Sequence, residues 1–272
     1  VPQLARSFGV FFTSHEPKGK KTFGAKIIPG RGAWIEMETD YDDVVYVRID
    51  RKRKFPVSIL LRAFGISTNE KILSLFTSLD AKRFVEKTLT KDHTTNVDEA
   101  AIEIHKRLRD GDLAAADNAR EFVKSIFDVE RYDLSRVGRF RFNNRFGGKA
   151  TPKELDRRTL SIDDLVTIIS HMAQLNSTPG AMADDIDHLG SRRVRYVGEL
   201  FQQKIRVGMA QIKRNVQNRM STIDTDVTLP VQFISPKPLQ ARIREFFTTN
   251  QLSQFMQQTN SLEELEHLRT LS

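Results

Sequence analysis

The sequence contains no cysteine in its 272 residues. This absence excludes disulfide bonds, thiolate metal sites and cysteine nucleophiles, and it is typical of proteins from a reducing compartment. Long apolar runs are also missing, since no segment approaches the roughly 20 residues that cross a bilayer. The first residues lack the basic and apolar regions of a signal peptide. The sequence therefore predicts a protein without membrane segments.

Recognisable catalytic motifs are absent as well. The sequence has no G-x-G-x-x-G motif, no G-x-S-x-G motif and no complete phosphate-binding loop. The acidic stretch DDIDHLG resembles the start of an EF-hand, but the positions that need oxygen ligands are Leu189 and Tyr196. The six histidines are scattered without metal-ligand spacing. We interpret the acidic residues 184–187 as caps for a following helix.

Basic residues outnumber acidic ones, with 43 lysines and arginines against 35 aspartates and glutamates, for a net charge of +8. This excess favours a polyanionic partner, because basic side chains release condensed counterions from a phosphate backbone. Two segments concentrate the charge: residues 48–54, and residues 136–146, where phenylalanines are interleaved. Arginines beside aromatic rings can follow a nucleic-acid backbone and stack on bases. An alternative, in which the phenylalanines are core and the arginines solvated, stays open.

The N-terminal part has the pattern of an antiparallel sheet. Short segments rich in β-branched and aromatic residues, separated by turn residues, predict a meander of strands at residues 9–15, 22–29, 33–39 and 44–50. In the third segment Ile35 and Met37 alternate with Trp34, Glu36 and Glu38. Successive side chains of a strand point to opposite faces, so one face of this sheet is expected to be wet.

Helical spacing of apolar residues follows the predicted sheet. It predicts helices within residues 56–65, 96–110, 118–127 and 161–175. In the second of these, Ala101, Ile104 and Leu108 share one face, and Asn96 or Asp98 can cap the start. The stretch 176–182, which contains a Pro-Gly pair, is the predicted linker. We therefore expect one domain over residues 1–183 and a second over residues 184–272.

The second part is expected to be mainly helical. Apolar residues at three- and four-residue steps predict one helix of about 30 residues from Gly190 to Met220. Its inner face would carry Val197, Phe201, Ile205, Met209, Ile212, Val216 and Met220. Its outer face would carry Arg192, Arg193, Arg195, Lys204, Arg206, Lys213, Arg214 and Arg219. A further helix enters at Pro238, with Leu239, Ile243, Phe246 and Phe247 inward. The predicted class is α+β: an antiparallel meander packed with helices, then a helical segment with one long helix.

Several stretches resemble one family closely. QLSQFMQQTNSLEELEHLRTLS, residues 251–272, resembles the rifamycin-pocket region of the bacterial RNA polymerase β subunit. DDIDHLGSRRVRYVGELFQQKIRVGMAQIKRNVQNRMS, residues 184–221, resembles the long helix that precedes it. VPQLARSFGVFF, GAKIIPGRGAWIEME, VRIDRKRKFPVSILLRAFG and RYDLSRVGRFRFN are similar to the same subunit, in its order. The resemblance covers essentially the whole chain.

The resemblance implies a part of a DNA-directed RNA polymerase, a nucleotidyltransferase, made of the lobe, the second protrusion segment and the fork. It implies DNA and nascent RNA as partners, together with the β′, α and ω subunits, sigma factor, and transcription factors on the lobe. It also implies a cytoplasmic, nucleoid-associated location. The family's catalytic Mg²⁺ is held by aspartates of the β′ subunit, so we expect no catalytic residue and no cofactor here. The chain begins with Val1 and ends inside a helical pattern, which predicts a fragment.

The family's contact with a nontemplate-strand guanine maps onto Arg6, Ile186, Asp187 and Arg192. The resemblance implies that Asp187 accepts hydrogen bonds from the unpaired base, while the arginines bind the backbone or stack. We expect Asp187 to share this duty with helix capping.

The rifamycin-type pocket beside the RNA path maps onto Gln3, Gln251, Leu252, Gln254, Phe255, Gln257, His267 and Ser272. Amide side chains offer both donors and acceptors, so they suit phosphate, ribose or a drug hydroxyl. The sequence departs from the family at several positions: Gln257 replaces Asp, Thr270 replaces Arg, Leu268 replaces Lys, Ser261 replaces Pro, and Thr248 replaces Gly. We therefore predict poor rifamycin sensitivity. Two other functions stay open, a stand-alone lobe module that docks transcription factors and an independent basic DNA-binding protein.

Overall fold

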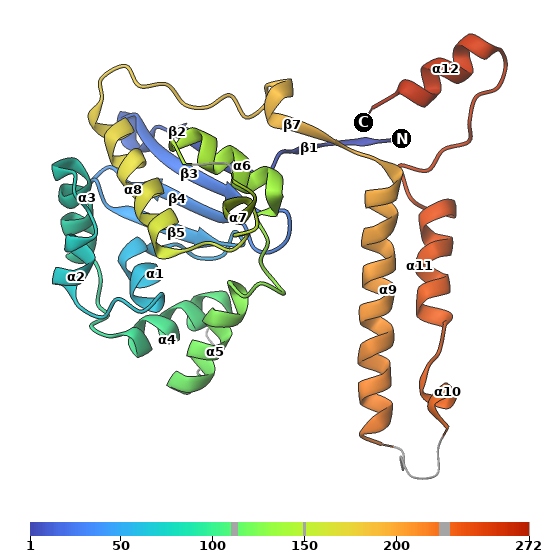
Figure 1. Ribbon diagram of the computed structural model, residues 1–272, viewed down its shortest axis with the longest axis horizontal. Coiled ribbons are helices and arrows are strands. Elements are labelled where there is room, and N and C mark those ends of the chain that lie inside the picture. Colours follow the sequence, from blue (N-terminus) through green and yellow to red (C-terminus); the bar gives the residue numbers. More distant parts are fainter. Residues whose placement is uncertain (110–113, 149–150, 223–228, 272) are drawn as a thin grey trace. The chain divides into compact units, whose positions relative to one another are not determined.

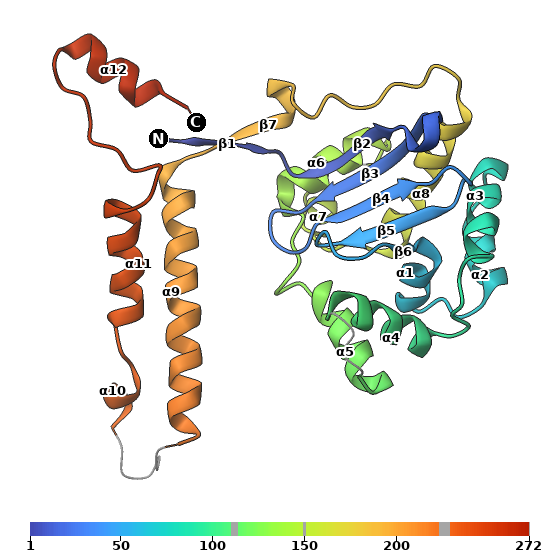
Figure 2. The same ribbon diagram turned by 180° about the vertical axis from the view of Figure 1, so that it is seen from behind.

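The chain folds into two compact units, which Figures 1 and 2 show from opposite sides. This computed structural model describes residues 1–109, 114–148, 151–222 and 229–271. The larger unit, called the α+β unit below, contains residues 7–186; the other, called the helical unit, combines residues 1–6 with residues 187–272. The division after residue 183 that the sequence predicts stays a prediction. Among the described residues, no helix has both the length and the apolar character to cross a membrane.

The α+β unit is built on a five-stranded antiparallel meander, as the sequence predicts. The strands are β2 (Gly9–His15), β3 (Thr22–Ile28), β4 (Ile35–Thr39), β5 (Val45–Ile49) and β6 (Phe55–Pro56), in that spatial order, with the short helix η1 (Pro17–Gly19) joining β2 to β3. Ile35 and Met37 are buried while Glu36 and Glu38 are partly exposed. The alternation therefore identifies the buried face of β4 correctly.

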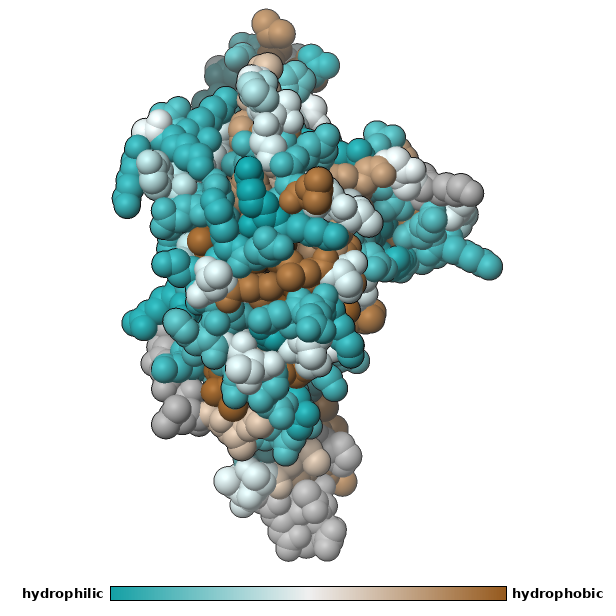
Figure 3. All heavy atoms as spheres, turned by 90° about the vertical axis from the view of Figure 1, so that its left-hand side faces the viewer, coloured by the Kyte–Doolittle hydropathy of each residue, from teal (hydrophilic) through white to brown (hydrophobic). Residues whose placement is uncertain are grey.

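The helices of this unit pack against the sheet or against one another. They are α1 (Val57–Ala63), α2 (Asn69–Ser74), α3 (Leu79–Leu89), α4 (Val97–Leu108), α5 (Ala116–Ile126), α6 (Ser135–Arg145), α7 (Pro152–Leu155) and α8 (Ile162–Ser177). The predicted cap of α4 is Asn96, whose side-chain oxygen accepts from the backbone N–H of Glu99 at 2.8 Å. In Figure 1, α8 lies in front of the sheet, and in Figure 2 the other sheet face is in front. On the side of α2 and α3, a band of apolar side chains crosses a mainly hydrophilic surface (Figure 3).

A buried ion pair joins α6 to the start of α8. The guanidinium of Arg139, which is 2% exposed, donates to both carboxylate oxygens of Asp164 at 2.8 and 3.0 Å. It also donates to the carbonyls of Arg157 and Thr159 at 2.6 and 2.7 Å. Asp164 completes a capping box with Ser161, so one carboxylate serves both the ion pair and the helix start.

The arginine-phenylalanine stretch therefore differs from both sequence interpretations. Arg139 is neither solvated nor free to bind a nucleic acid, because its donors are used inside the protein. Phe142 is buried, as the core alternative expects, but Phe140 is 48% exposed.

The predicted linker and the predicted acidic cap need correction. Helix α8 continues to Ser177, so Asn176 belongs to the helix, where its amide bonds both backbone groups of Phe23. Asp184 does not cap the helices that follow it in the described residues, where His188 and Tyr196 hold the N-cap positions. Its carboxylate accepts from the backbone N–H of Phe12 at 2.7 Å and pairs with both terminal nitrogens of Arg145 at 2.7 and 2.9 Å. This segment is thus fastened to the edge of β2.

The helical unit contains a strand where the sequence predicts helix. Its elements are β1 (Gln3–Arg6), the short helix η2 (Leu189–Ser191), β7 (Arg192–Arg195), α9 (Val197–Met220), α10 (Pro230–Phe233), α11 (Lys237–Thr248) and α12 (Ser261–Arg269). The long helix has 24 residues and starts at Val197, not at Gly190. Pairing of residues 192–195 with β1 prevails over their helical pattern, since tertiary contacts override local preference.

Helices α9 and α11 pack closely at one point and leave other predicted core positions open. A Cβ added at Gly208 would lie 3.0 Å from Leu239 Cδ1, so glycine permits the close approach of α11. The rings of Phe201 and Phe246 have centroids 5.3 Å apart. Phe247 is 60% exposed, contrary to the prediction. Val197, Met209 and Met220 are also exposed rather than inward.

We expect Arg139→Met to destabilise the α+β unit strongly. The substitution leaves the buried Asp164 carboxylate with the longer ion pair to Arg157 at 3.8 Å, so the free energy of unfolding should fall by about 3–5 kcal/mol. Urea denaturation followed by circular dichroism measures this loss.

Arg136→Met is the matched control, since Arg136 lies on the same helix and pairs at 3.7 Å with Asp156 in an exposed position. It should cost less than about 1 kcal/mol. Equal losses for the two variants would contradict the special role of the buried pair.

The α+β unit should lose stability in mild acid through His171. Its ring packs against Phe12 with centroids 4.7 Å apart, and burial together with the nearby Arg145 charge lowers the pKa of His171. Because the unfolded chain binds this proton more tightly, the stabilising contribution is present above the unfolded pKa of about 6.5 and is lost as the pH falls below it. Denaturation curves between about pH 7.5 and about pH 5 should be less pH-dependent in His171→Gln than in the parent chain. The exposed His93→Gln control should keep the parent slope; an unchanged slope in His171→Gln would refute the assignment.

Candidate nucleic-acid interface

Strands β1 and β7 form a two-stranded antiparallel ribbon that carries two of the four candidate DNA-binding residues, Arg6 and Arg192. The register pairs are Gln3 with Arg195, Leu4 with Val194, Ala5 with Arg193, and Arg6 with Arg192. Side chains alternate between the two faces of a ribbon, so Arg6 and Arg192 share one face while Arg193 and Arg195 lie on the other. The ribbon therefore sorts its arginines into two groups.

Arg193 and Arg195 hold the ribbon against α9 through hydrogen bonds and ion pairs. Arg193 donates from its two terminal nitrogens to the two carboxylate oxygens of Glu199, at 2.6 Å each, and Arg195 Nε lies 3.4 Å from the same carboxylate. The Arg193 hydrogen bonds hold the pKa of Glu199 below its usual range. Arg195 also donates to the side-chain oxygens of Gln203 and Gln3 at 2.6 and 3.3 Å. These arginines are therefore committed to the fold.

Arg6 and Arg192, on the other face of the ribbon, have no carboxylate partner among the described residues. In the part of the chain that the structure describes, neither Arg6 nor Arg192 has a side-chain hydrogen bond or an ion pair. Arg6 is exposed and Arg192 is half-buried. Like charges directly opposite each other on a ribbon repel, so an anion bound between them would relieve this repulsion. The pair can bind a phosphate through planar, charge-assisted hydrogen bonds.

The other two candidate DNA-binding residues lie close in sequence to this ribbon. Asp187 is exposed and stands two positions before η2, and His188 caps η2 by accepting from the backbone N–H of Gly190 at 3.0 Å. The residue at the N-cap of α9 is Tyr196, so the predicted capping duty of Asp187 is wrong. Ile186 is the last residue of the α+β unit and is partly exposed.

The glutamine-rich residues follow α11. A small cavity of about 220 Å³ brings two of the predicted pocket residues, Gln254 and His267, together; it is lined by Val1, Pro2, Val197, Gln254, Met256, His267 and Leu268. The backbone N–H of Gln257 donates to His267 Nδ1 at 3.0 Å. Phe255 is 98% exposed and does not line the cavity.

Three further pocket candidates, Gln3, Gln251 and Leu252, do not line that cavity. Gln251 is exposed and Leu252 is half-buried in the turn after α11, and Gln3 lies on β1, where its side chain accepts from Arg195. Ser272 lies outside the described residues. Asn260 accepts from the backbone N–H of Glu263 at 2.8 Å and thereby caps α12.

Sequence reasoning missed the positioning role of Arg193, Arg195 and Glu199. It assigned both arginines to the outer face of one long helix. The usable signal was the alternation in SRRVRY, where Val194 separates two arginines with strand periodicity.

Comparison with known proteins gives one consistent result. Residues 6–195 match the family model described as RNA polymerase Rpb2, domain 2. Over its whole length the chain is 44% identical to the DNA-directed RNA polymerase subunit beta of Syntrophomonas wolfei and 43% identical to that of Synechocystis sp.. In each case it spans 24% of the relative's length, about a quarter. The chain therefore belongs to the family of DNA-directed RNA polymerase β subunits, in the region that contains Rpb2 domain 2.

Proposed function

We propose that this chain holds unpaired DNA within a DNA-directed RNA polymerase, and that the Arg6–Arg192 pair is its anchor. The observation that carries this proposal is the register of the ribbon, which sets two guanidinium groups opposite each other without a carboxylate partner among the described residues. Phosphates of the nontemplate strand are the matching anions, since contacts to phosphates set the position of a strand on a protein.

The base contact would be made by the neighbouring residues. Asp187 is exposed, and its carboxylate can accept from the N1 and N2 donors of an unpaired guanine. Ile186 would supply an apolar contact to the base. This arrangement recognises a base edge that is available only after the duplex has melted, and it suits the downstream edge of a transcription bubble.

The chemistry of chain elongation would belong to another subunit. The resemblance assigns the catalytic Mg²⁺ to aspartates of β′, and we propose β′, α, ω, sigma factor and nascent RNA as the partners in a cytoplasmic, nucleoid-associated enzyme. The glutamine-rich segment would lie beside the RNA, where amide groups meet phosphate and ribose without a fixed charge. Its cavity would be the remnant of a rifamycin-type pocket.

Arg192→Ala should weaken binding of single-stranded DNA by the 272-residue chain. Losing one phosphate contact should lower the slope of log affinity against log salt concentration by about 0.7. Fluorescence anisotropy of a labelled oligonucleotide across a salt series measures both effects, and Arg6→Ala should behave alike.

Arg214→Ala is the matched control, because Arg214 is exposed on α9 in the same unit. It should leave the salt slope close to that of the parent chain. If the control lowers affinity as much as Arg192→Ala does, binding depends on net charge and the proposed anchor is wrong.

A polymerase whose β subunit carries this region should resist rifamycin, and Gln257→Asp should increase its sensitivity. The substitution supplies the carboxylate acceptor that the family has at this position, so drug hydroxyl groups gain a charge-assisted hydrogen bond worth about 1.5–3 kcal/mol. Drug titration of transcription by the assembled enzyme measures the change, with Gln258→Asp as the neighbouring control. Strong inhibition of the unaltered enzyme would contradict the prediction.

A further inference from the structure

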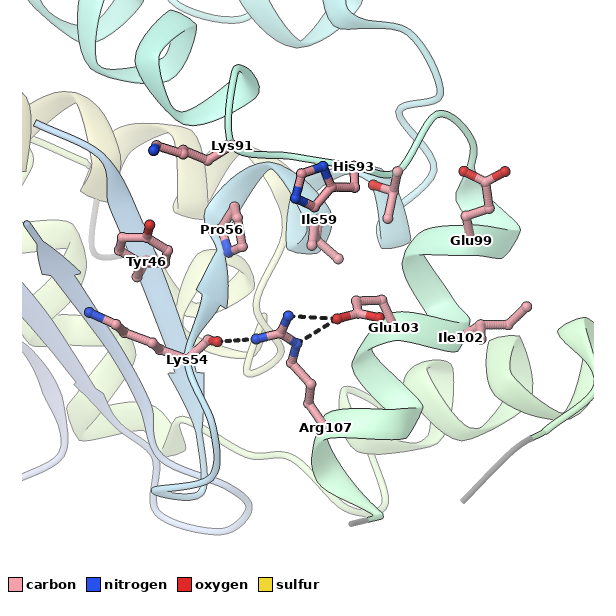
Figure 4. A pocket seen from close by; sticks show the side chains of 11 residues that line it. Tyr46, Lys54, Pro56, Ile59, Lys91, His93, Glu99, Ile102, Glu103 and Arg107 are labelled. Carbon is pink, nitrogen blue, oxygen red and sulfur yellow. Dashed lines mark hydrogen bonds and ion pairs between the residues drawn. The ribbon is translucent and has the colours of Figure 1, made fainter. Parts of the chain in front are cut away.

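A pocket of about 520 Å³ opens on the α+β unit between the end of the sheet and α4 (Figure 4). Its lining comes from β5, the segment around β6, α1, the loop after α3, and one face of α4; the residues are Tyr46, Lys54, Pro56, Ile59, Lys91, His93, Thr94, Glu99, Ile102, Glu103 and Arg107. None of these belongs to the ribbon or to the glutamine-rich segment. This volume lies within the range of about 300–1,000 Å³ that is usual for ligand pockets.

The interior of the pocket is apolar. Pro56 and Ile59 are buried, and Ile102 lines the pocket from α4. Each Å² of apolar area that a ligand removes from water here contributes about 25 cal/mol to the free energy of binding. The pocket therefore suits aliphatic or aromatic side chains.

The acidic groups of the lining are already engaged. Arg107 Nε donates to Glu103 Oε1 at 2.7 Å, and the same guanidinium donates to the carbonyl of Lys54 (Figure 4). Glu99 accepts from the backbone N–H and the hydroxyl of Thr95 at 2.8 and 3.0 Å, and these bonds lower the pKa of Glu99. A ligand therefore finds few free acceptors here.

Two ammonium groups and the Tyr46 hydroxyl gather at one end of the pocket. Lys91, Tyr46 and Lys54 lie together at the end of the pocket opposite Ile102 (Figure 4). Within the described ranges, the side chains of Lys91 and His93 have neither a hydrogen bond nor an ion pair. The Lys54 ammonium lies 4.5 Å from the centre of the Tyr46 ring and 3.6 Å from an Asp40 carboxylate oxygen. A single anionic group would complete this end.

The loop that carries Lys91 and His93 is fixed by hydrogen bonds to the buried side chain of Asp92. Asp92, whose side chain is fully buried, accepts from the backbone N–H and the hydroxyl of Thr94 at 2.8 and 2.6 Å and from Arg62 Nε at 3.1 Å. Burial by itself raises the pKa of Asp92, but these hydrogen bonds outweigh burial and lower it. The rim is therefore preorganised, which reduces the entropy lost on binding.

We propose that this pocket docks an acidic peptide segment of a partner protein, with an apolar side chain over Pro56 and Ile59 and a carboxylate between Lys91 and Lys54. Charge decides between a peptide and a nucleic acid. Glu99 and Glu103 would repel a continuous phosphate backbone along the pocket. One carboxylate, in contrast, can meet Lys91 and Lys54 at the other end, where the Asp40 carboxylate is paired with Lys54. This surface goes beyond the DNA contact proposed above, and it can be tested without transcription.

The test uses the 272-residue chain and three fluorescein-labelled nonapeptides with Gly-Ser ends. The first alternates phenylalanine and leucine with aspartate and glutamate; the second has asparagine and glutamine in place of the acids; the third has serine in place of the apolar residues. In anisotropy titrations the first should bind, and the other two should bind at least about tenfold more weakly. Lys91→Glu should weaken the first peptide by about tenfold or more, because the added carboxylate repels that of the ligand.

Lys71→Glu is the matched control, since Lys71 is exposed on α2 and outside the pocket lining. It should leave peptide affinity within about twofold. Ile102→Gln provides an independent variant that should weaken the first peptide through the apolar part of the pocket, with circular dichroism to confirm folding of each variant. The proposal is overturned if the acidic peptide fails to bind at millimolar concentration. It is also overturned if Lys91→Glu and Lys71→Glu act alike, or if Lys91→Glu weakens single-stranded DNA and leaves the peptide unaffected.

Discussion

The pairing of residues 3–6 with residues 192–195 is the constraint on which the rest of the molecule depends. These strands are short, and they are separated in sequence by the entire α+β unit. Their register decides which arginines face each other and which are turned toward Glu199. A shift of one residue would exchange the two faces, since side chains alternate along a strand. Backbone hydrogen bonds between the strands thus determine the surroundings of each arginine.

Arginines have different surroundings in this chain, although composition treats all arginines alike. Arg139 is a buried structural cation that satisfies a helix cap and two carbonyls. Arg193 donates two hydrogen bonds to Glu199 and so holds β7 against α9. Arg192, its neighbour in sequence, is available for an external anion. What separates these surroundings is the presence or absence of a carboxylate, because a guanidinium that is already paired offers little to a phosphate.

Local patterns predicted the larger part of the fold. The alternation around Met37 identified the buried face of the sheet, and the spacing of apolar residues located α1, α4, α5 and α8. Local patterns failed at β7, whose conformation depends on a partner strand at the other end of the chain. They failed again at Arg139, because a buried ion pair requires two segments that the sequence does not show to be neighbours. Arg6 and Arg192 were named through resemblance alone, and only the register explains why they belong together.

The α+β unit lies in the sequence between the two strands of the ribbon, and this order along the chain affects the order of folding. Bringing two distant strands together costs loop-closure entropy, and this cost is reduced once the intervening chain has become compact. Contacts between distant residues form slowly for the same reason. We therefore expect the meander and its helices to fold first and the ribbon to close afterwards, so that the arginine pair is assembled in the last stage of folding.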